Sequence, residues 1–400
     1  MDKYKDRGVS SGKEDVHKAI SGLDKGLFPR AFCKILPDFA GNDLAFCNVM
    51  HADTAGTKPS LAYIYWRETG NPEVWKNLIQ DALIMNLDDL ICVGITDNII
   101  VSSTIGRNRN LIPAEVISYL IQGTDSYLKE LQRLGIGIHL AGGETADVGD
   151  IVRTLDVGFT AFARIQKNKI IDNANIRAGD TITGIASFGH ASYEKTYNSG
   201  IGSNGLTSAR HDVFSKWVAE KYPESYDHQI PEELVYSGNL KPLDKISFDY
   251  QSPDGVLHKI ETDAASLVLS PTRTYAPVIQ KILSQIPLNK IHGVVHCSGG
   301  GQTKVLHYID NLHIIKDNLF SPPPVFKMIQ EQSSTEWREM YRVFNMGHRM
   351  EIYSDEETSK EIIKIANAFG IHAAAIGRTE SSSQKKVTVQ AASGTFIYNG

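Results

Sequence analysis

The sequence predicts an α/β protein built from two domains, and three observations favour this fold class. The chain has 400 residues, which is more than one hydrophobic core usually organises. Short apolar runs typical of strands alternate with amphipathic helical patterns in both halves. Turns that contain glycine or acidic residues follow several of these strands, and α/β sheets bind their ligands at such strand ends.

The boundary between the two domains is expected in the polar segment 172–179. We therefore predict an N-terminal arm over residues 1–30, an N-terminal domain over 31–172 and a C-terminal domain over 173–400. Within the second domain, residues 222–265 are polar and irregular, which is typical of an insertion that runs over the surface.

The composition excludes several functional classes. A net charge of −5 leaves no basic face for nucleic acid, and no apolar run reaches the length of a membrane span. The first residues are charged and lack the apolar core of a signal peptide, so we expect a cytoplasmic protein. Four cysteines without paired spacing indicate reduced thiols rather than a disulfide or zinc framework. They are Cys33, Cys47, Cys92 and Cys297.

The stretch from His51 to Lys58 follows a predicted strand at 46–50 and combines a carboxylate, two hydroxyls and an ammonium group. A hard cation such as Mg²⁺ needs carboxylate oxygens, and phosphate needs cationic side chains and backbone N–H groups. The same residues are equally typical of a solvated surface turn. The stretch alone does not decide between a phosphate site and a plain turn.

Acidic residues and glycines end two further elements of the first half. A predicted helix over 72–91 ends at Asp88-Asp89, where the helix dipole disfavours acids, so the pair is either compensated by a cation or solvated. A predicted strand over 137–141 leads into Gly142-Gly143-Glu144, where glycine allows close backbone approach. The other predicted helices cover 13–23, 111–134, 206–221, 271–283, 336–344 and 357–369, and two more begin at 302 and at 322–324. The other predicted strands cover 99–101, 155–165, 181–187, 291–297, 350–353, 371–376 and 387–389.

Residues 200–205 have the pattern GxGxxG, but their surroundings exclude a dinucleotide-binding turn. A polar loop precedes them in place of a strand, and no acidic residue ends a second strand about 20 positions later. The turn opens a helix and is therefore either an anion site or a plain helix N-cap. A second glycine turn, 299–301, follows a strand that ends at His296. No Walker P-loop motif is present in the sequence.

Eight segments, in this order, resemble the phosphoribosylformylglycinamidine cyclo-ligase (aminoimidazole ribonucleotide, or AIR, synthase) family of purine biosynthesis. Each segment is a weak signal alone, but eight in register over nearly the whole chain are specific. They are Tyr4-Lys5-Asp6…Gly8-Val9, Asp53…Gly56-Thr57-Lys58, Asp88-Asp89-Leu90, Gly142-Gly143-Glu144-Thr145-Ala146-Asp147, Gly202-Ser203-Asn204-Gly205, Pro271-Thr272-Arg273…Tyr275, His296-Cys297-Ser298-Gly299-Gly300-Gly301 and Glu339-Met340-Tyr341-Arg342…Phe344-Asn345-Met346-Gly347.

The resemblance implies a homodimer in which the N-terminal sheets of two subunits close into a β-barrel, beside a mixed α/β C-terminal domain. It also implies ATP and Mg²⁺ in the cleft between the domains. The implied reaction converts formylglycinamidine ribonucleotide and ATP to 5-aminoimidazole ribonucleotide, ADP and phosphate. The γ-phosphoryl group makes the amide oxygen a leaving group, and the amidine nitrogen then closes the ring. Such phosphoryl transfer depends mainly on positioning and charge neutralisation.

The resemblance also implies roles for individual residues. The implied Mg²⁺ ligands are Asp53, Asp89 and Glu144. The implied ATP-binding residues are Asp53, Gly56, Thr57, Lys58, Gly142, Gly143 and Glu144. The implied substrate-binding residues are Ser203, Asn204, Gly205 and Arg273. The implied catalytic residues are His296, Lys58 and Asp89, with His296 the candidate for proton transfer or for stabilising the departing phosphate.

Two departures from the family pattern leave alternatives open. Gly202 stands where the family often has histidine, so that histidine is either dispensable or replaced by another, such as His190 or His211. The N-terminal region also lacks the usual glycine-rich loop.

The alternative functions are another ATP-using enzyme of the same fold and a non-catalytic homologue that serves as a binding module. The enzymes of this fold include selenophosphate synthetase, thiamine monophosphate kinase and a hydrogenase-maturation dehydratase. The missing reactive cysteine in that loop disfavours the first of these enzymes, and the absence of cysteine at the chain end disfavours the last.

Overall fold

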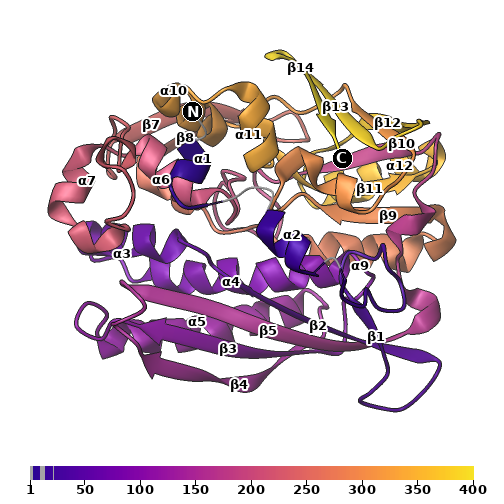
Figure 1. The fold of residues 1–400 in the computed structure, drawn as a ribbon, viewed down its shortest axis with the longest axis horizontal. Coiled ribbons are helices and arrows are strands. Elements are labelled where there is room, and N and C mark those ends of the chain that lie inside the picture. The colour runs from indigo at the N-terminus through magenta and orange to yellow at the C-terminus, as the bar shows by residue number, and fades with distance from the viewer. Residues whose placement is uncertain (1–2, 10–13, 21) are drawn as a thin grey trace.

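The first half of the protein is a five-stranded sheet covered on one face by helices (Figure 1). The computed structural model describes residues 3–9, 14–20 and 22–400. The strand order is β1-β2-β5-β3-β4, and every neighbouring pair is antiparallel except β3–β4. The elements up to residue 169 are α1 Lys3–Asp6, α2 Glu14–Ile20, β1 Ile35–Pro37, β2 Phe46–Thr54, α3 Lys58–Thr69, α4 Glu73–Ile91, β3 Ile99–Arg107, α5 Ala114–Arg133, β4 Ile138–Asp147, β5 Leu155–Gln166 and η1 Lys167–Lys169.

The second half contains a seven-stranded mixed sheet in the order β14-β13-β10-β12-β6-β11-β9 and a separate hairpin, β7–β8. Its strands are β6 Thr181–Ala186, β7 Lys245–Gln251, β8 Leu257–Asp263, β9 Ile291–His296, β10 Leu312–Lys316, β11 His348–Ser354, β12 Ala373–Ser381, β13 Lys386–Ala391 and β14 Gly394–Asn399. Its helices are η2 Asn173–Asn175, α6 Leu206–Val213, α7 Lys216–Lys221, η3 Pro223–Ser225, η4 Glu232–Leu234, α8 Ala264–Leu269, α9 Ala276–Gln285, η5 Leu288–Lys290, η6 Gly301–His307, α10 Pro324–Ser333, α11 Trp337–Val343 and α12 Glu356–Ala368.

Helix α4 forms the layer between the two halves, and this position explains its composition. It packs on β2 and β5 of the first sheet, on its neighbour α5, and on α9 of the second half (Figure 1). It is therefore buried on nearly every side, and four polar residues between its middle and its C-terminal end are buried with it. Buried polar groups need hydrogen-bond partners, so this helix organises the polar contacts between the halves. The four residues are Asp81, Asn86, Asp88 and Asp89.

Most predicted helices and strands lie where the sequence places them, and the differences are instructive. The residues predicted as a turn at 142–147 continue strand β4 along the edge of the sheet. The predicted helix 206–221 is two helices, because the chain is extended at Phe214 and Ser215. The segment 222–265 is not irregular throughout, since it contains the β7–β8 hairpin. Helix α3 and strands β1, β10 and β14 have no counterpart among the predicted elements.

All four cysteines are buried and free. No helix in the described residues combines the length and apolarity needed to cross a membrane.

Candidate active site

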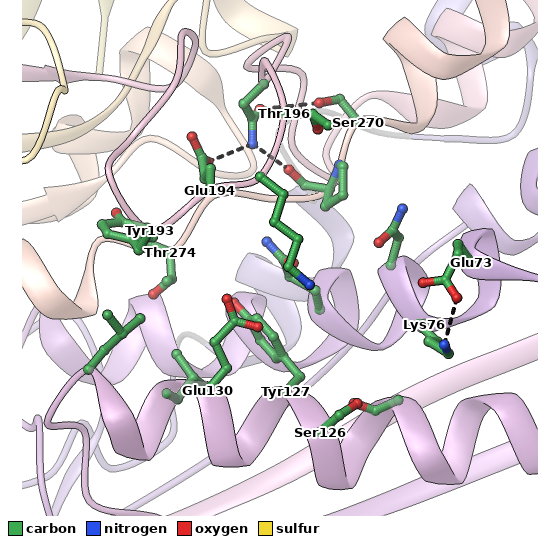
Figure 2. Close-up of a pocket in the computed structure, with 18 of the residues that line it drawn as sticks. Glu73, Lys76, Ser126, Tyr127, Glu130, Tyr193, Glu194, Thr196, Ser270 and Thr274 are labelled. Carbon is green, nitrogen blue, oxygen red and sulfur yellow. Dashed lines mark hydrogen bonds and ion pairs between the residues drawn. The ribbon is translucent and has the colours of Figure 1, made fainter.

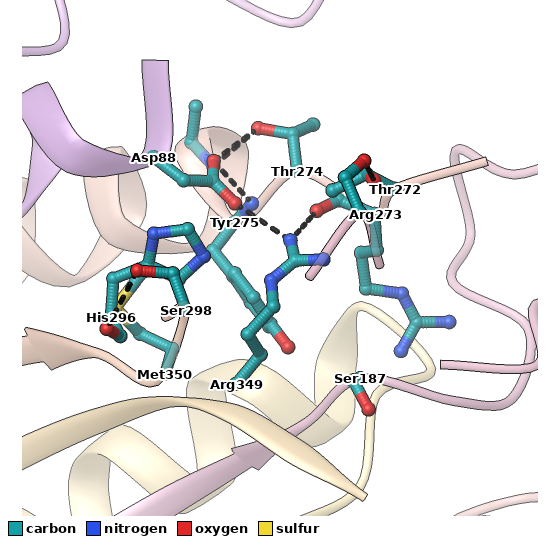
Figure 3. Close-up of polar contacts among 12 residues, drawn as sticks. Asp88, Ser187, Thr272, Arg273, Thr274, Tyr275, His296, Ser298, Arg349 and Met350 are labelled. Carbon is teal, nitrogen blue, oxygen red and sulfur yellow. Dashed lines mark hydrogen bonds and ion pairs between the residues drawn. The ribbon is translucent and has the colours of Figure 1, made fainter. Parts of the chain in front are cut away.

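Two aspartates of α4 hold a segment of the second half against the first. Asp81 accepts hydrogen bonds from the backbone N–H and the hydroxyl of Thr272, at 2.8 and 2.6 Å. Asp88 accepts hydrogen bonds from the hydroxyl of Thr274 at 3.0 Å and from the N–H of Tyr275 at 3.2 Å (Figure 3). Since the two aspartates are seven residues apart, they lie on one face of the helix, two turns apart. The Pro271–Tyr275 motif is therefore fixed to α4.

Lys58 is fully buried at the same junction. Its Nζ donates to Asp81 Oδ1 and to the carbonyl of Ser270, each at 2.6 Å, and to the carbonyl of Gly202 at 3.3 Å. An ammonium group has three hydrogens, so these three acceptors satisfy it. Burial lowers the pKa of Lys58, and the charge of Asp81 opposes this shift. The structure places Lys58 as a link between the halves, whereas the resemblance implies a phosphate contact.

The turn that begins at Asp53 lies against the Gly202–Gly205 loop. The hydroxyls of Thr57 and Thr207 are 2.9 Å apart. Gly56 adopts a left-handed conformation, and a Cβ on it would lie 3.9 Å from the carbonyl oxygen of Ser203. The folded chain thus brings together two segments that the sequence analysis assigned to ATP and to the second substrate.

Asp89 is shared by two histidines. Its Oδ1 lies 2.6 Å from Nδ1 of His296, and its Oδ2 lies 3.1 Å from Nε2 of His51. Burial alone raises the pKa of Asp89, but the hydrogen bonds from His296 and His51 hold it below its usual range. The His296 ring is buried, and its Nε2 has no partner in the described part of the chain. An imidazole held at Nδ1 by a carboxylate presents Nε2 for proton transfer.

The Ser203-Asn204-Gly205 turn lies beside the second glycine turn. The Ser203 hydroxyl is 2.9 Å from that of Thr272. Asn204 Oδ1 is buried without a partner among the described residues, and its Nδ2 is 3.8 Å from the position of a Cβ on Gly299. Gly205 is left-handed and packs on Phe344, where a Cβ would be 2.4 Å from a ring carbon. This loop therefore lies against the glycine turn that follows the strand ending at His296.

Arg273 is a buried structural cation in this arrangement. Its guanidinium pairs with Glu194 and donates to the carbonyls of Ala186 and Phe188, at 3.1 and 2.7 Å. Burial lowers the pKa of Arg273, but the charge of Glu194 more than compensates and raises it. Figure 3 shows its side chain directed away from Asp88. The implied substrate-binding role is thus not evident in its contacts.

The carboxylates that the resemblance implies for Mg²⁺ do not fit a common site within one chain. Asp53 is in register with Phe159, Phe159 with Ser103, and Ser103 with Gly143, so three strand spacings of about 4.8 Å separate Asp53 from Gly143. Gly142, Gly143 and Glu144 lie on the exposed edge strand β4. Both oxygens of Asp89 already accept hydrogen bonds from imidazoles.

Another group of metal-type ligands lies within the second half, apart from these residues. Among the described residues, Cys297, His348 and Glu351 have ligand atoms within 4.8 Å of one another. The ammonium group of Lys316 contacts Glu351, so a cation already fills this polar cluster. A divalent metal ion is disfavoured there.

A groove of about 390 Å³ opens between α4, α5 and the loop at 193–198 (Figure 2). Tyr127, Tyr193 and Thr274 are among its lining residues, together with charged side chains of both signs. None of the predicted site residues lines it. It lies beside the Pro271–Tyr275 segment but is distinct from the site around His296.

Sequence reasoning missed three residues of the site. His51 opens the first stretch discussed above but was given no role, and Asp81 lies in the predicted helix 72–91 but was likewise given none. Arg349 lies directly before a predicted strand, two residues beyond the last segment used for the resemblance, and reaches Asp88 at 3.0 Å. A charged residue directly before a strand that contains Met350, Ile352 and Tyr353 was the available signal for Arg349.

Comparison with known proteins decides the family. The family model described as AIR synthase related protein, N-terminal domain, matches residues 41–165, and the corresponding C-terminal model matches residues 257–390. Together they span more than half of the chain. The chain belongs to the AIR synthase related protein family. The predicted resemblance is thus confirmed.

Relatives of this AIR synthase family member match over most of its length. A Methanocaldococcus jannaschii protein named phosphoribosylformylglycinamidine cyclo-ligase is 29% identical over 391 residues, covering 95% of this chain and 92% of the relative. A Pyrococcus furiosus protein of the same name is 30% identical over 291 residues, covering 72% and 68%. A chain in the crystal structure of a HypE-HypF complex aligns with a TM-score of 0.56 at 12% identity, covering 97% of this chain and 99% of that chain. This last likeness confirms the fold class.

Proposed function

We propose that this AIR synthase family member catalyses the ATP-dependent cyclisation of formylglycinamidine ribonucleotide to 5-aminoimidazole ribonucleotide, with release of ADP and phosphate. The enzyme would thus be a C–N bond-forming ligase of purine biosynthesis. The observation that carries the proposal is the near-full-length similarity to relatives named for this reaction. The site geometry supports it, because the carboxylate-bound imidazole of His296 ends the strand before the glycine turn, and Gly299 of that turn lies beside Asn204.

His296 is the proposed group for proton transfer. When neutral and donating from Nδ1 to Asp89, its ring has a lone pair on Nε2. This nitrogen takes the proton that the amidine nitrogen loses as it closes the ring, or returns it to the departing phosphate. Asp89 holds the tautomer and orients the ring, as carboxylates do beside catalytic histidines.

ATP supplies the phosphoryl group in this proposal, and Mg²⁺ neutralises phosphate charge. Mg²⁺ commonly binds through one or two carboxylates together with substrate phosphates. Since one chain does not assemble three carboxylates, we propose that the ion arrives with ATP and is not held at a preformed protein site. A cytoplasmic location stays a prediction.

A homodimer through the first sheet is part of the proposal. The outer face of this sheet exposes Met50 and Ile100, at 63% and 46%, and β4 is a long unprotected edge. Edges and apolar faces of this kind are usually covered. Light scattering should give twice the chain mass, and Ile100→Glu should yield monomer. A monomeric wild-type protein would reject this part.

ADP release with Mg·ATP separates the cyclo-ligase from its alternatives. Turnover should require formylglycinamidine ribonucleotide and should produce 5-aminoimidazole ribonucleotide in equal amount. Another ATP-using enzyme of the same fold would release ADP only with a different substrate. A binding module would bind ligand without turnover. Absence of ribonucleotide-dependent ADP release would therefore refute the proposed function.

A further inference from the structure

Arg349 is a buried cation at the site that has no role in the reaction described so far. It lies near the start of β11, and its side chain is 2% exposed. Its Nη2 donates to Asp88 Oδ2 at 3.0 Å and to the carbonyl of Arg273 (Figure 3). Its guanidinium also lies 5.4 Å from the centre of the Tyr275 ring. One nitrogen of the guanidinium is thus fixed to the segment that α4 holds.

The rest of the guanidinium is less well satisfied. Nε of Arg349 is buried and has no partner in the described part of the chain. A buried donor on a charged group is costly to leave unpaired, and such groups generally have a partner when the protein is at work. The guanidinium therefore retains capacity for a ligand.

Two other unpartnered polar atoms lie on the neighbouring segments. His296 pairs in register with Met350, the residue after Arg349, and the N–H of Cys297 donates to the Arg349 carbonyl at 2.7 Å. His296 Nε2 and Asn204 Oδ1 are both buried without partners among the described residues. A guanidinium donor, an amide oxygen and an imidazole nitrogen on neighbouring segments are thus buried without partners in the described part of the chain, and buried polar groups of this kind generally have a partner.

Gly202 makes room for the guanidinium. It has a φ of +71°, and a Cβ on it would lie 3.0 Å from Nη1 of Arg349 and 3.6 Å from its Cδ. A side chain at 202 and the guanidinium would therefore compete for the same space. His190 and His211, suggested as replacements for a histidine at 202, lie elsewhere, since His190 is exposed and bound to Glu194, and His211 is buried beside Tyr236.

We propose that Arg349, the buried cation next to the Gly202–Asn204 loop, binds a phosphate oxygen of the reactants. The planar guanidinium matches phosphate geometry and stays charged at any working pH. The other two buried cations at the junction, Lys58 and Arg273, have every donor nitrogen hydrogen-bonded, whereas Arg349 pairs with Asp88 through Nη2 and leaves Nε without a partner in the described part of the chain. The phosphate is either the 5′-phosphate of the ribonucleotide or the γ-phosphoryl group of ATP. This inference rests on the proposed cyclo-ligase function.

Kinetics and direct binding test this role together. Arg349→Met and Arg349→Lys should raise one KM about 10–100-fold, because a charge-assisted hydrogen bond is lost. A rise for the ribonucleotide alone identifies its 5′-phosphate, and a rise for ATP alone identifies the γ-phosphoryl group. In binding assays, ribose 5-phosphate and tripolyphosphate serve as probes for the same two sources. The variant should lose the affinity of the wild-type protein for one of them.

Arg210→Lys is the matched control. Arg210 is also buried with an unpartnered Nε, but its Nη1 bonds to Ser225 and Tyr236, outside the site. The substitution Arg210→Lys should lower thermal stability and leave both KM values unchanged. Should Arg349→Met not fold, Gly202→Ala keeps Arg349 and places a methyl group against Nη1, and it should raise the same KM.

Two results would overturn the inference. Unchanged KM values in Arg349→Lys and Gly202→Ala would do so, and so would wild-type affinity of these variants for both probes. The probe measurements need no turnover. A wild-type protein that binds a probe through Arg349 yet shows no cyclisation would therefore contradict only the proposed function.

Discussion

Three buried aspartates of helix α4 have two different roles. Asp81 and Asp88 accept hydrogen bonds from Thr272, Thr274 and Tyr275 and so join the two halves. Asp89 accepts hydrogen bonds from two imidazoles and leaves one of them with an unpartnered nitrogen in the described structure. Adjacent helix positions point about 100° apart, so Asp88 and Asp89 face different surroundings. Neighbours in sequence thus divide into a carboxylate that joins the two halves and one that orients the imidazole of the proposed reaction.

The largest expected effect is on stability, at the ion pair between Lys58 and Asp81. Lys58→Met leaves Asp81 buried without its cation, and breaking a buried ion pair costs about 3–5 kcal/mol. Chemical denaturation should show a loss of that size in the free energy of unfolding. Lys76→Met, which removes an exposed pair with Glu73 near the start of α4, should change it by less than about 0.5 kcal/mol.

A different result would assign Lys58 a role in the reaction instead of in stability. If Lys58→Met unfolds like the wild-type protein but loses turnover, its ammonium group acts on phosphate as the resemblance implies. Asp81, the partner of Lys58, would then belong to the reaction site like Asp89, and the two aspartates would not differ in role.

The second effect is on turnover, at His296 and Asp89. His296→Ala should lower kcat about 100-fold or more, because a proton-transfer group is removed. Asp89→Asn should lower kcat as well, since the ring loses its orienting carboxylate. Steady-state ADP release measures both.

His292→Ala provides the control for this pair. His292 lies on the same strand, β9, is also buried, and its Nδ1 is 2.8 Å from Asp180. It should affect stability and leave kcat at the wild-type value. An unchanged kcat in His296→Ala would make His296 the structural equivalent of His292.

Smaller losses of stability should follow when the hydroxyls that donate hydrogen bonds to Asp81 and Asp88 are removed. Thr272→Val and Thr274→Val each remove a hydrogen bond to a buried carboxylate, so each should cost about 1.5–3 kcal/mol. Denaturation curves measure this loss. Thr69→Val, at an exposed hydroxyl, should be neutral within about 0.5 kcal/mol. Losses no larger than this control would show that the hydroxyls contribute little to the junction.

The smallest effect concerns an aspartate outside the junction. The Arg164 guanidinium hydrogen-bonded to Asp38 holds the pKa of that carboxyl at about 2. A lowered pKa stabilises the fold above the unfolded value of about 3.9, and this contribution is lost as pH falls toward 2. Melting temperatures of the wild-type protein and Arg164→Gln should therefore differ above about pH 4 and converge near pH 2. A constant difference would contradict the pKa shift.

Sequence periodicity predicted the fold class and most elements, because strands and amphipathic helices bury one face each. It missed helix α3, which begins at Lys58 immediately after the first turn. It also missed that β4 continues through Gly142 and Gly143, since glycine there suggested a turn while backbone pairing with β3 decides the outcome.

The candidate site was less predictable from sequence. Motifs identified His296, Asp89 and Asn204, but the partners of Lys58 and Arg273 depend on contacts between residues far apart in the chain. The space between Gly202 and Arg349 exists only in the folded protein. Such pairings follow from tertiary packing, which no local pattern encodes.

The attachment of α4 to the Pro271–Tyr275 segment limits how the protein can move. Swinging the two halves apart as rigid bodies would break at once the four hydrogen bonds that Thr272, Thr274 and Tyr275 donate to Asp81 and Asp88. The loops at 200–205 and 299–301 can shift without breaking these bonds. Reactants should therefore enter through local loop motion, while the distance between the two sheets stays constant during turnover.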